Sequence, residues 1–166
     1  MSAEQLLTQE VGSLAKPDWR VAAVAGKEIT DAHIADALVW AGRLGIEQDE
    51  VEFAFRRIRE DADCAQEECQ DLAKQNARNL AARFAVGLQE KAGLDIVYDG
   101  EQDRSEMYQH AITRTAGFEP LGRVRVFDDK WYRKAVCVGE VGITEPWHTD
   151  EAIRLQGLTD KRIKVP

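Results

Sequence analysis

The stretch 93-GLDIVYDGEQDRSEMY-108 places a short apolar run directly before a dense cluster of polar side chains. Residues 94–98 are mostly branched or aromatic and lie between Gly93 and the Asp99-Gly100 turn signal, so they are expected to form a buried strand. Ligands of α/β folds gather at the carboxyl ends of parallel strands. Glu101 is therefore the first candidate functional residue. The alternative is a surface turn whose acidic residues cap the following helix.

The composition is that of one soluble domain with a sizeable core. The chain has 166 residues, of which 44% are hydrophobic and 31% are charged. Its net charge of -8 argues against nucleic acid or an anionic membrane surface as a partner. No apolar run approaches the roughly 20 residues of a membrane span, and the N-terminus lacks the basic-then-apolar layout of a signal peptide. We therefore expect a cytoplasmic protein.

The cysteines and histidines predict no metal site contained within this chain. Three cysteines without a disulfide-framework spacing fit a reducing compartment. Cys64 and Cys69 are five residues apart in a strongly helical stretch, so they are expected to point to different faces. The histidines, which are His33, His110 and His148, are far apart and form no two-ligand helical motif.

The N-terminal region predicts a strand over residues 6–11 that breaks at Gly12-Ser13. A glycine there lets a ligand approach the backbone, and the serine adds a hydroxyl. Residues 19–24 follow as a loop or short helix after Pro17. A helix with a Thr30-Asp31 cap then ends at Gly42 and Gly45.

Residues 46–86 contain no glycine or proline and carry a heptad-like apolar stripe, which slips at Asn76. The segment is expected to be one long helix with a stutter or two helices, of which part projects or pairs with another chain. Its many acidic residues are expected to be a solvated face, with a functional acidic patch as the alternative. The stripe consists of Val51, Phe55, Ile58, Ala62, Ala65, Cys69 and Leu72, followed by Ala73, Ala77, Leu80, Phe84 and Leu88.

The C-terminal third predicts a helix over residues 105–114, a loop marked by Gly117, Pro120 and Gly122, and strands near residues 124–127 and 135–138. The helix would hold Glu106 and His110 as a surface pair. A further helix through residue 155 and a strand beginning at residue 163 complete the chain. This alternation favours successive βα units of a parallel sheet. Bases interleaved with aromatic residues over 130–134 favour an anionic, ring-containing ligand.

Four stretches resemble the catalytic barrel of cobalamin-independent methionine synthase: 8-TQEVGSLAKPDW-19, 88-LQEKAGLDIVYDGEQDRSEMY-108, 132-YRKAVCVGEV-141 and 158-LTDKRIKVP-166. The resemblance implies a (β/α)8 TIM barrel that transfers a methyl group from methyltetrahydrofolate to homocysteine, with zinc holding the thiol as thiolate. Metal coordination deprotonates a thiol at neutral pH and leaves it nucleophilic.

The resemblance also implies roles for individual residues. Val11, Gly12 and Ser13 match the segment that binds the amino-acid end of homocysteine, and Glu101 matches the carboxylate that pairs with its ammonium group. Lys130 and Trp131 match positions that contact the folate. The family's zinc ligands, a His and a Cys, then a Glu and a second Cys, belong to the second half of the barrel. None is therefore expected in this chain, and no catalytic residue is assigned.

A whole barrel takes about 250 residues, so 166 residues supply only its first three to four βα units, with residues 46–86 as a helical insertion. An open half barrel leaves an unpaired sheet edge. We expect either a fragment, inactive alone, or a chain completed by a complementing C-terminal half. The alternatives are a related zinc-dependent enzyme that alkylates another thiol, such as coenzyme M, and a non-catalytic module that self-associates through the helical segment.

Overall fold

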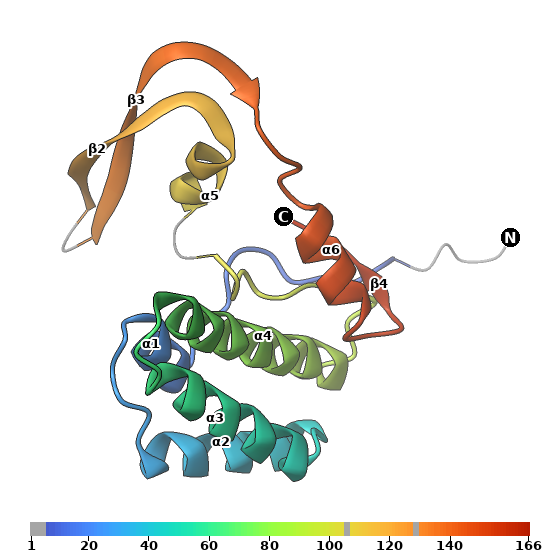
Figure 1. Cartoon of the computed structure of the whole chain (residues 1–166). Helices are drawn as coiled ribbons and strands as arrows, with labels where there is room; N and C mark the ends of the chain where they lie inside the picture. The colour runs from blue at the N-terminus through green and yellow to red at the C-terminus, as the bar shows by residue number, and fades with distance from the viewer. Residues whose placement is uncertain (1–5, 105–106, 128–129) are drawn as a thin grey trace, which may run out of the picture. The chain divides into compact units, whose positions relative to one another are not determined.

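The structure, a computed structural model, describes residues 6–104, 107–127 and 130–166. The chain forms two compact units, one made of Met1–Asp103 with Arg154–Pro166 and the other of Arg104–Ile153 (Figure 1). Among the described residues, the first unit contains four helices and two short strands, and the second contains a helix and a hairpin. A further helix, Thr149–Gln156, has residues in both units. In chain order the elements are α1 (Asp18–Val24), α2 (Asp31–Leu44), α3 (Gln48–Ala62), α4 (Glu67–Lys91), β1 (Ile96–Val97), α5 (Met107–Thr113), β2 (Thr115–Phe127), β3 (Lys130–Ile143), α6 (Thr149–Gln156) and β4 (Arg162–Ile163).

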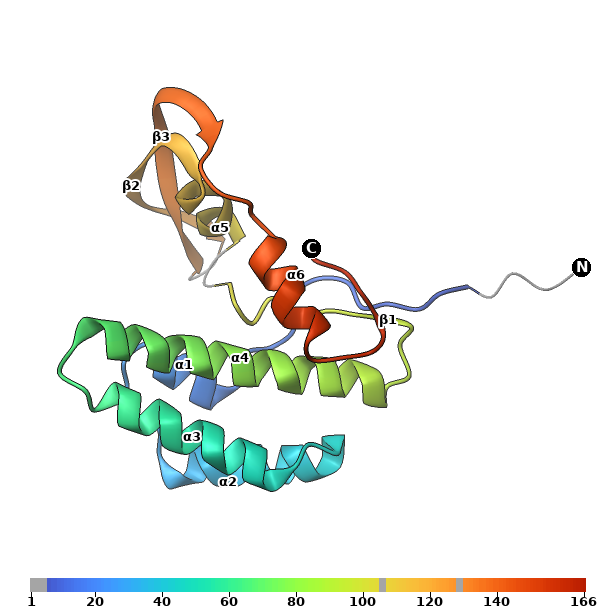
Figure 2. The same ribbon diagram turned by 45° about the vertical axis from the view of Figure 1, so that its right-hand side comes forward.

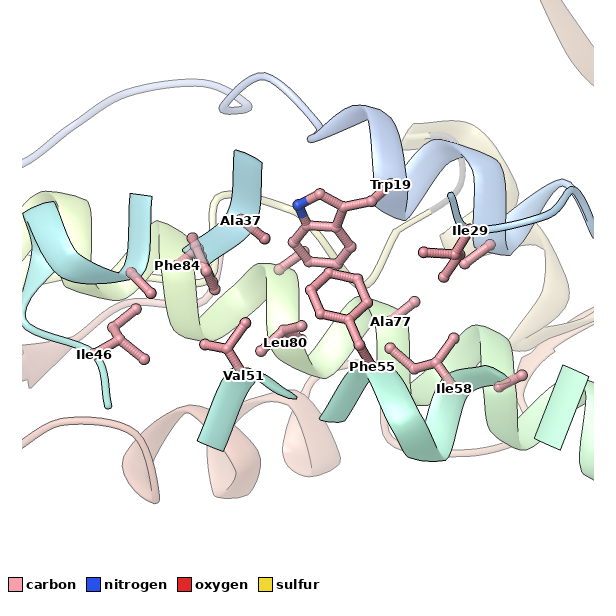
Figure 3. Close-up of a cluster of buried hydrophobic side chains, with 14 residues drawn as sticks. Trp19, Ile29, Ala37, Ile46, Val51, Phe55, Ile58, Ala77, Leu80 and Phe84 are labelled. Atoms are coloured by element: carbon pink, nitrogen blue, oxygen red, sulfur yellow. The ribbon is translucent and has the colours of Figure 1, made fainter. Parts of the chain in front are cut away.

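The main hydrophobic core lies among helices α1 to α4 of the first unit. Figure 3 shows Trp19 of α1 beside Phe55 of α3, and the ring centroids of this pair are 5.3 Å apart in an edge-to-face arrangement. Phe84 of α4 meets the same indole at 5.9 Å. Edge-to-face aromatic pairs add stabilisation beyond the area that they bury. The core therefore fixes α1, which directly follows the candidate Gly12-Ser13 segment, against α3 and α4.

Helix α2 begins at the predicted cap and ends at Gly45, but Gly42, predicted to end it as well, lies inside the helix. The Thr30 hydroxyl accepts a hydrogen bond from the backbone N–H of His33, and Gly45 ends the helix in the left-handed conformation at φ 74°. Both signals act locally, because an N-cap oxygen satisfies a free helical N–H and glycine carries no Cβ to oppose a positive φ.

Residues 46–86 form two helices, so the two-helix alternative is confirmed, but the break lies at residues 63–66 and not at Asn76. Helices α3 and α4 turn back on each other and lie side by side (Figure 2). Val51, Phe55 and Ile58 are buried against this partner helix. The predicted continuation of the stripe through Ala62 and Ala65 is wrong, because both residues are exposed beside the break.

This arrangement also bears on the expectation that the helical segment projects or pairs with another chain. On α4 the predicted stripe residues Ala73, Ala77 and Leu80 are buried in the same core, whereas Leu72 is 52% exposed. The apolar stripe of α3 is thus covered by the chain's own α4.

Helix α4 is joined to β1 through Gln89, which is buried. Its amide Nε2 donates to the carbonyl oxygen of Tyr98 at 2.7 Å, and its Oε1 accepts from the Tyr98 backbone N–H at 3.3 Å. The side chain thus satisfies both backbone groups of the residue that follows β1. An unsatisfied buried backbone group is costly, so Gln89 fixes the end of this strand.

The fold is mixed α/β, and its predicted parallel pairing is confirmed for β1 with β4. A parallel bridge between Gln9 and Ile96 places the N-terminal segment on β1 as well. The predicted strand over residues 6–11 is reduced to this one bridge. Even so, the carboxyl ends of the segment containing Gln9 and of β1 lie at the same edge.

In the second unit, β2 and β3 form one long antiparallel hairpin. The prediction of separate short strands in a parallel sheet, with a loop at Gly117, Pro120 and Gly122, is wrong. The pairing shifts register between Ala116 and Phe118 and again between Pro120 and Arg123, so these glycines and this proline mark irregularities inside a strand. A Cβ at Gly117 would lie 2.5 Å from the Glu140 carbonyl oxygen, which explains why the ribbon needs glycine there. The expected turn at Asp128-Asp129 lies outside the described residues.

Helix α5 confirms most of the predicted helix over 105–114, and α6, which ends at Gln156, confirms the helix predicted through residue 155. Glu106, expected to pair with His110, lies outside the described residues. None of the described helices combines the length and the apolar character that a membrane span requires.

Candidate functional site

The candidate site of the first unit consists of two loops, each at the carboxyl end of a parallel segment. The first loop is residues 12–16, after the bridge at Gln9, and the second loop is residues 98–103, after β1. The backbone N–H of Leu14 donates to the Gly100 carbonyl oxygen at 3.1 Å, and the Tyr98 hydroxyl donates to the Gly12 carbonyl oxygen. The two predicted segments are therefore in direct contact.

Gln102 adds a second set of bonds between the loops. Its side chain is buried, and its Nε2 lies 3.4 and 3.3 Å from the carbonyl oxygens of Leu14 and Ala15. In the described part of the chain, no donor lies within hydrogen-bond distance of Gln102 Oε1. Buried polar atoms are normally paired, so this oxygen is an acceptor that solvent or a ligand can satisfy.

The second loop holds Glu101 in a strained conformation. Its φ is 58°, the left-handed region that non-glycine residues seldom adopt. The buried carboxylate of Asp99 enforces this conformation, because Oδ1 accepts from the Glu101 N–H at 2.8 Å and Oδ2 from the Asp103 N–H at 3.3 Å. Such strain persists only where the surroundings determine it, and it concentrates at functional sites.

Arg20 of α1 forms hydrogen bonds with the backbone of the same loop. Its guanidinium is buried, and Nε and NH2 donate to the Gln102 carbonyl oxygen at 3.2 and 2.6 Å. Burial lowers the pKa of Arg20, and the charge of Arg78 adds to this effect. The second loop is therefore tied both to the first loop and to the helical core.

The charges of the site act on Tyr98 and Lys16. Burial raises the pKa of Tyr98, and the carboxylates of Glu10, Glu101 and Asp99 raise it further, so its hydroxyl stays protonated and donates. Burial lowers the pKa of Lys16, as does the charge of Arg20, while Glu101 and Asp99 oppose this shift.

The predicted site residues divide into two groups. Gly12, Ser13 and Glu101 lie on the two joined loops, whereas Val11 is 80% exposed and its N–H bonds the side chain of Glu10. Trp131 is 56% exposed on β3 of the second unit. The side chain of Lys130 lies outside the described part of the structure.

Lys16, Tyr98, Asp99 and Gln102 are site residues that the sequence reasoning did not single out. The sequence feature that could have pointed to Asp99 and Gln102 is the density of polar residues after β1. Asp99 acts locally, on the backbone of Glu101 and Asp103. The roles of Lys16, Tyr98 and Gln102 depend on contacts between segments about 85 residues apart, which no local pattern encodes.

The structure also brings together three groups that the sequence keeps apart. His110, His148 and Glu151 of the second unit offer ligand atoms within 4.8 Å of one another. However, Arg104 NH2 bonds both oxygens of Glu151 at 3.3 and 3.1 Å and lies 3.5 Å from His148 Nδ1. A guanidinium in the middle of the cluster opposes a metal cation.

Both ring nitrogens of His110 already have hydrogen-bond partners. Its Nε2 lies 3.1 Å from the Trp147 carbonyl oxygen, so it donates there, and its Nδ1 lies 3.0 Å from Arg114 NH1, so it accepts there. Burial lowers the pKa of His110, and the charges of Arg114 and Arg104 add to this, which keeps the ring neutral. This cluster does not fit zinc, since no lone pair of His110 is left to bind it.

The cysteines require a correction. Cys64 and Cys69 were expected on different faces of one helix, but they lie on either side of the start of α4, and a hydrogen bond with Cys64 raises the pKa of Cys69. The break between α3 and α4 removes the helical spacing on which the expectation relied. Both are free thiols.

Comparison with known proteins defines the family. Residues 50–165 match the model of the cobalamin-independent synthase catalytic domain. The chain belongs to the cobalamin-independent methionine synthase family. Glu101 lies inside the matched range, as does most of the segment expected to be an insertion, whereas the Gly12-Ser13 motif precedes it.

Individual relatives agree with the family match. The chain is 40% identical over 87 residues to a methionine synthase of Thermoplasma acidophilum, and 38% identical over 78 residues to one of Thermococcus kodakarensis. It is 32% identical over 81 residues to a 5-methyltetrahydropteroyltriglutamate–homocysteine methyltransferase of Streptomyces avermitilis. These alignments cover 52%, 46% and 48% of this chain, but only 25%, 23% and 10% of the respective relatives. The chain thus spans about a quarter of the archaeal relatives that it matches.

Proposed function

We propose that this chain is the homocysteine-anchoring part of a methionine-synthase-like (β/α)8 barrel. The parallel arrangement of the N-terminal segment, β1 and β4 suits the first strands of such a barrel. Active sites of barrel enzymes lie at the carboxyl ends of the strands, which is where the two joined loops lie.

Within this site, the Glu101 carboxylate pairs with the ammonium group of homocysteine. Gly12 and Ser13 offer backbone groups and a hydroxyl to the amino-acid end of the substrate. The observation that carries the proposal is the left-handed backbone of Glu101, which Asp99 holds beside the first loop. A ligand-binding carboxylate gains affinity when its position is fixed before binding.

Methyl transfer itself belongs to the complete barrel. Zinc, bound there by residues outside this chain, would deprotonate the substrate thiol. Methyltetrahydrofolate is the proposed methyl donor, and Lys130 and Trp131 are its proposed contacts. The printed name of the Streptomyces relative specifies this donor class.

The test is reconstitution. The chain is mixed with a zinc-loaded segment of an archaeal relative that carries the remainder of the barrel. The mixture should form methionine from homocysteine and methyltetrahydrofolate, and each component alone should be inactive. Methyl transfer to coenzyme M but not to homocysteine would instead support the related thiol alkyltransferase. Failure of the chain to bind any amino-acid thiol would contradict the proposed role.

A further inference from the structure

The side chain of Lys16, at the end of the first loop, forms a hydrogen bond with the backbone of Glu101. Its Nζ donates to the Glu101 carbonyl oxygen at 3.2 Å, and the side chain is half-buried. A lysine ammonium has three N–H donors, so this bond leaves two for other partners. Within the described ranges, Lys16 makes no other hydrogen bond and no ion pair.

The carboxylate of Glu101 is close to Lys16 but does not pair with it. The ammonium meets the backbone oxygen of Glu101 and not the side-chain oxygens, and Glu101 forms no ion pair with any described residue. The opposite charges nevertheless influence each other, since Glu101 favours the charged form of Lys16. Lys16 and Glu101 thus form a neighbouring cation and anion, with hydrogen-bonding capacity left on both.

We propose that Lys16 and Glu101 together form a clamp for a zwitterion, in which Lys16 binds the α-carboxylate of an amino-acid substrate while Glu101 binds its ammonium group. This assignment of Lys16 rests on the proposed function. Lys16 is then a specificity-determining residue, because a thiol that lacks a carboxylate cannot form this bond. The ammonium and carboxylate groups of an α-amino acid are bonded to the same Cα, which matches a cation held against the backbone of the residue that supplies the anion.

Two other cations near this site have partners of their own. Lys164 Nζ donates to the Glu10 carbonyl oxygen and lies 4.6 Å from the centroid of the Tyr98 ring. Both donating nitrogens of Arg20 that face the second loop bond the Gln102 carbonyl oxygen, and its side chain is only 4% exposed. Lys16 is thus the cation that the described residues of this unit place on the Glu101 backbone, and its side chain is half-buried. Charge-assisted bonds to carboxylates are among the stronger hydrogen bonds, so its loss should be measurable.

Titration calorimetry with three thiols separates recognition from a merely structural role. L-homocysteine carries both charges, 3-aminopropane-1-thiol lacks the carboxylate, and 4-sulfanylbutanoate lacks the ammonium group. Lys16→Met should weaken homocysteine binding about tenfold or more, and should change the affinity for 3-aminopropane-1-thiol by no more than about twofold. Glu101→Gln should weaken the binding of 3-aminopropane-1-thiol and should leave the affinity for 4-sulfanylbutanoate nearly unchanged. Lys27→Met, at an exposed lysine of the same unit, is the matched control.

If Lys16→Met weakens the binding of all three thiols equally, or does not weaken the binding of homocysteine, the assignment of Lys16 is overturned. The proposed function stays intact in that case if Glu101→Gln still weakens homocysteine binding. If the wild-type chain binds L-cysteine or L-methionine but not homocysteine, and that binding depends on Lys16, the clamp stands and the proposed substrate is wrong. Absence of binding to every amino acid would overturn both.

Discussion

The backbone nitrogen of Leu14 lies 3.1 Å from the carbonyl oxygen of Gly100, and the Leu14 side chain fills the space that a Cβ on Gly100 would need. This contact joins the loop that follows the N-terminal segment to the loop that follows β1. Both proposed anchoring groups, at Ser13 and at Glu101, are one residue away from it. The geometry of the site therefore depends on how closely these two backbones approach.

Replacing Gly100 by alanine should open this junction. Gly100 has a φ of 67°, and an added Cβ would lie 3.0 Å from the Cβ and Cδ1 of Leu14. We expect Gly100→Ala to lower the free energy of unfolding by about 1–3 kcal/mol, measured by urea denaturation. Gly93→Ala is the matched control, because Gly93 has a φ of 80° and no atom within 4 Å of an added Cβ. Equal losses in the two variants would show that the contact with Leu14 is unimportant.

The pairing of Thr8 with Asp95 should make stability depend on acid. Asp95 Oδ2 accepts from the N–H and the hydroxyl of Thr8, both at 2.8 Å, and these bonds lower the pKa of Asp95. A depressed carboxyl pKa stabilises the fold above the unfolded value, roughly 3.9, and this contribution is lost as the pH falls through the folded pKa. Wild type should therefore be more stable than Asp95→Asn at pH 6, and the difference should shrink towards pH 3. A difference that stays constant over this range would contradict the account.

Ile58 tests whether the apolar stripe is core or interface. Its side chain is 1% exposed and packs in the core between α3 and α4. Ile58→Ala should cost about 2–5 kcal/mol of folding stability, with an unfolding midpoint independent of protein concentration. Phe53→Ala, at a 55% exposed position of the same helix, should cost much less. If the unfolding midpoint instead rises with protein concentration, and Ile58→Ala abolishes this dependence, assembly through this segment would be favoured.

The cluster of His110, His148 and Glu151 should not retain zinc, because Arg104 and Arg114 occupy its polar atoms. We expect no stoichiometric metal after equilibrium dialysis of the purified chain against zinc followed by elemental analysis. His110→Ala should leave the result unchanged. One tightly held equivalent in the wild type would contradict this prediction, and its loss in His110→Ala would locate the ion in the cluster.

Local signals predicted the parts of the fold that depend on neighbouring residues. Thr30 and Gly45 defined α2 because capping and positive φ act within a few residues. The turn between α3 and α4 contains no glycine or proline, and Ala62 and Ala65 continued the apolar spacing across it, so the break was expected too late in the chain. The hairpin was missed because Gly117 and Pro120, which usually mark loops, sit at register shifts within β2.

For the candidate site, the sequence predicted the segments but not the contacts. Glu101 stood out because it follows an apolar run and a turn signal. The left-handed φ of Glu101 depends on a local bond to Asp99, two residues earlier, which the Asp99-Gly100 turn signal did not specify. The bond from Lys16 to the Glu101 backbone spans 85 residues and therefore has no local signature. The same holds for His110 and His148, whose stacked rings are brought together by the fold.

The most direct test of the central claim is the affinity of L-homocysteine for the wild-type chain and for Glu101→Gln, measured by titration calorimetry under reducing conditions. Glutamine keeps the size of the side chain and removes the charge, and Glu28→Gln, at an exposed glutamate of the same unit, is the control. We predict that Glu101→Gln weakens binding about tenfold or more, since a charge-assisted bond is lost, while Glu28→Gln binds as wild type does. An affinity unchanged in Glu101→Gln would contradict the assignment of these two loops as the anchor of an amino-acid substrate.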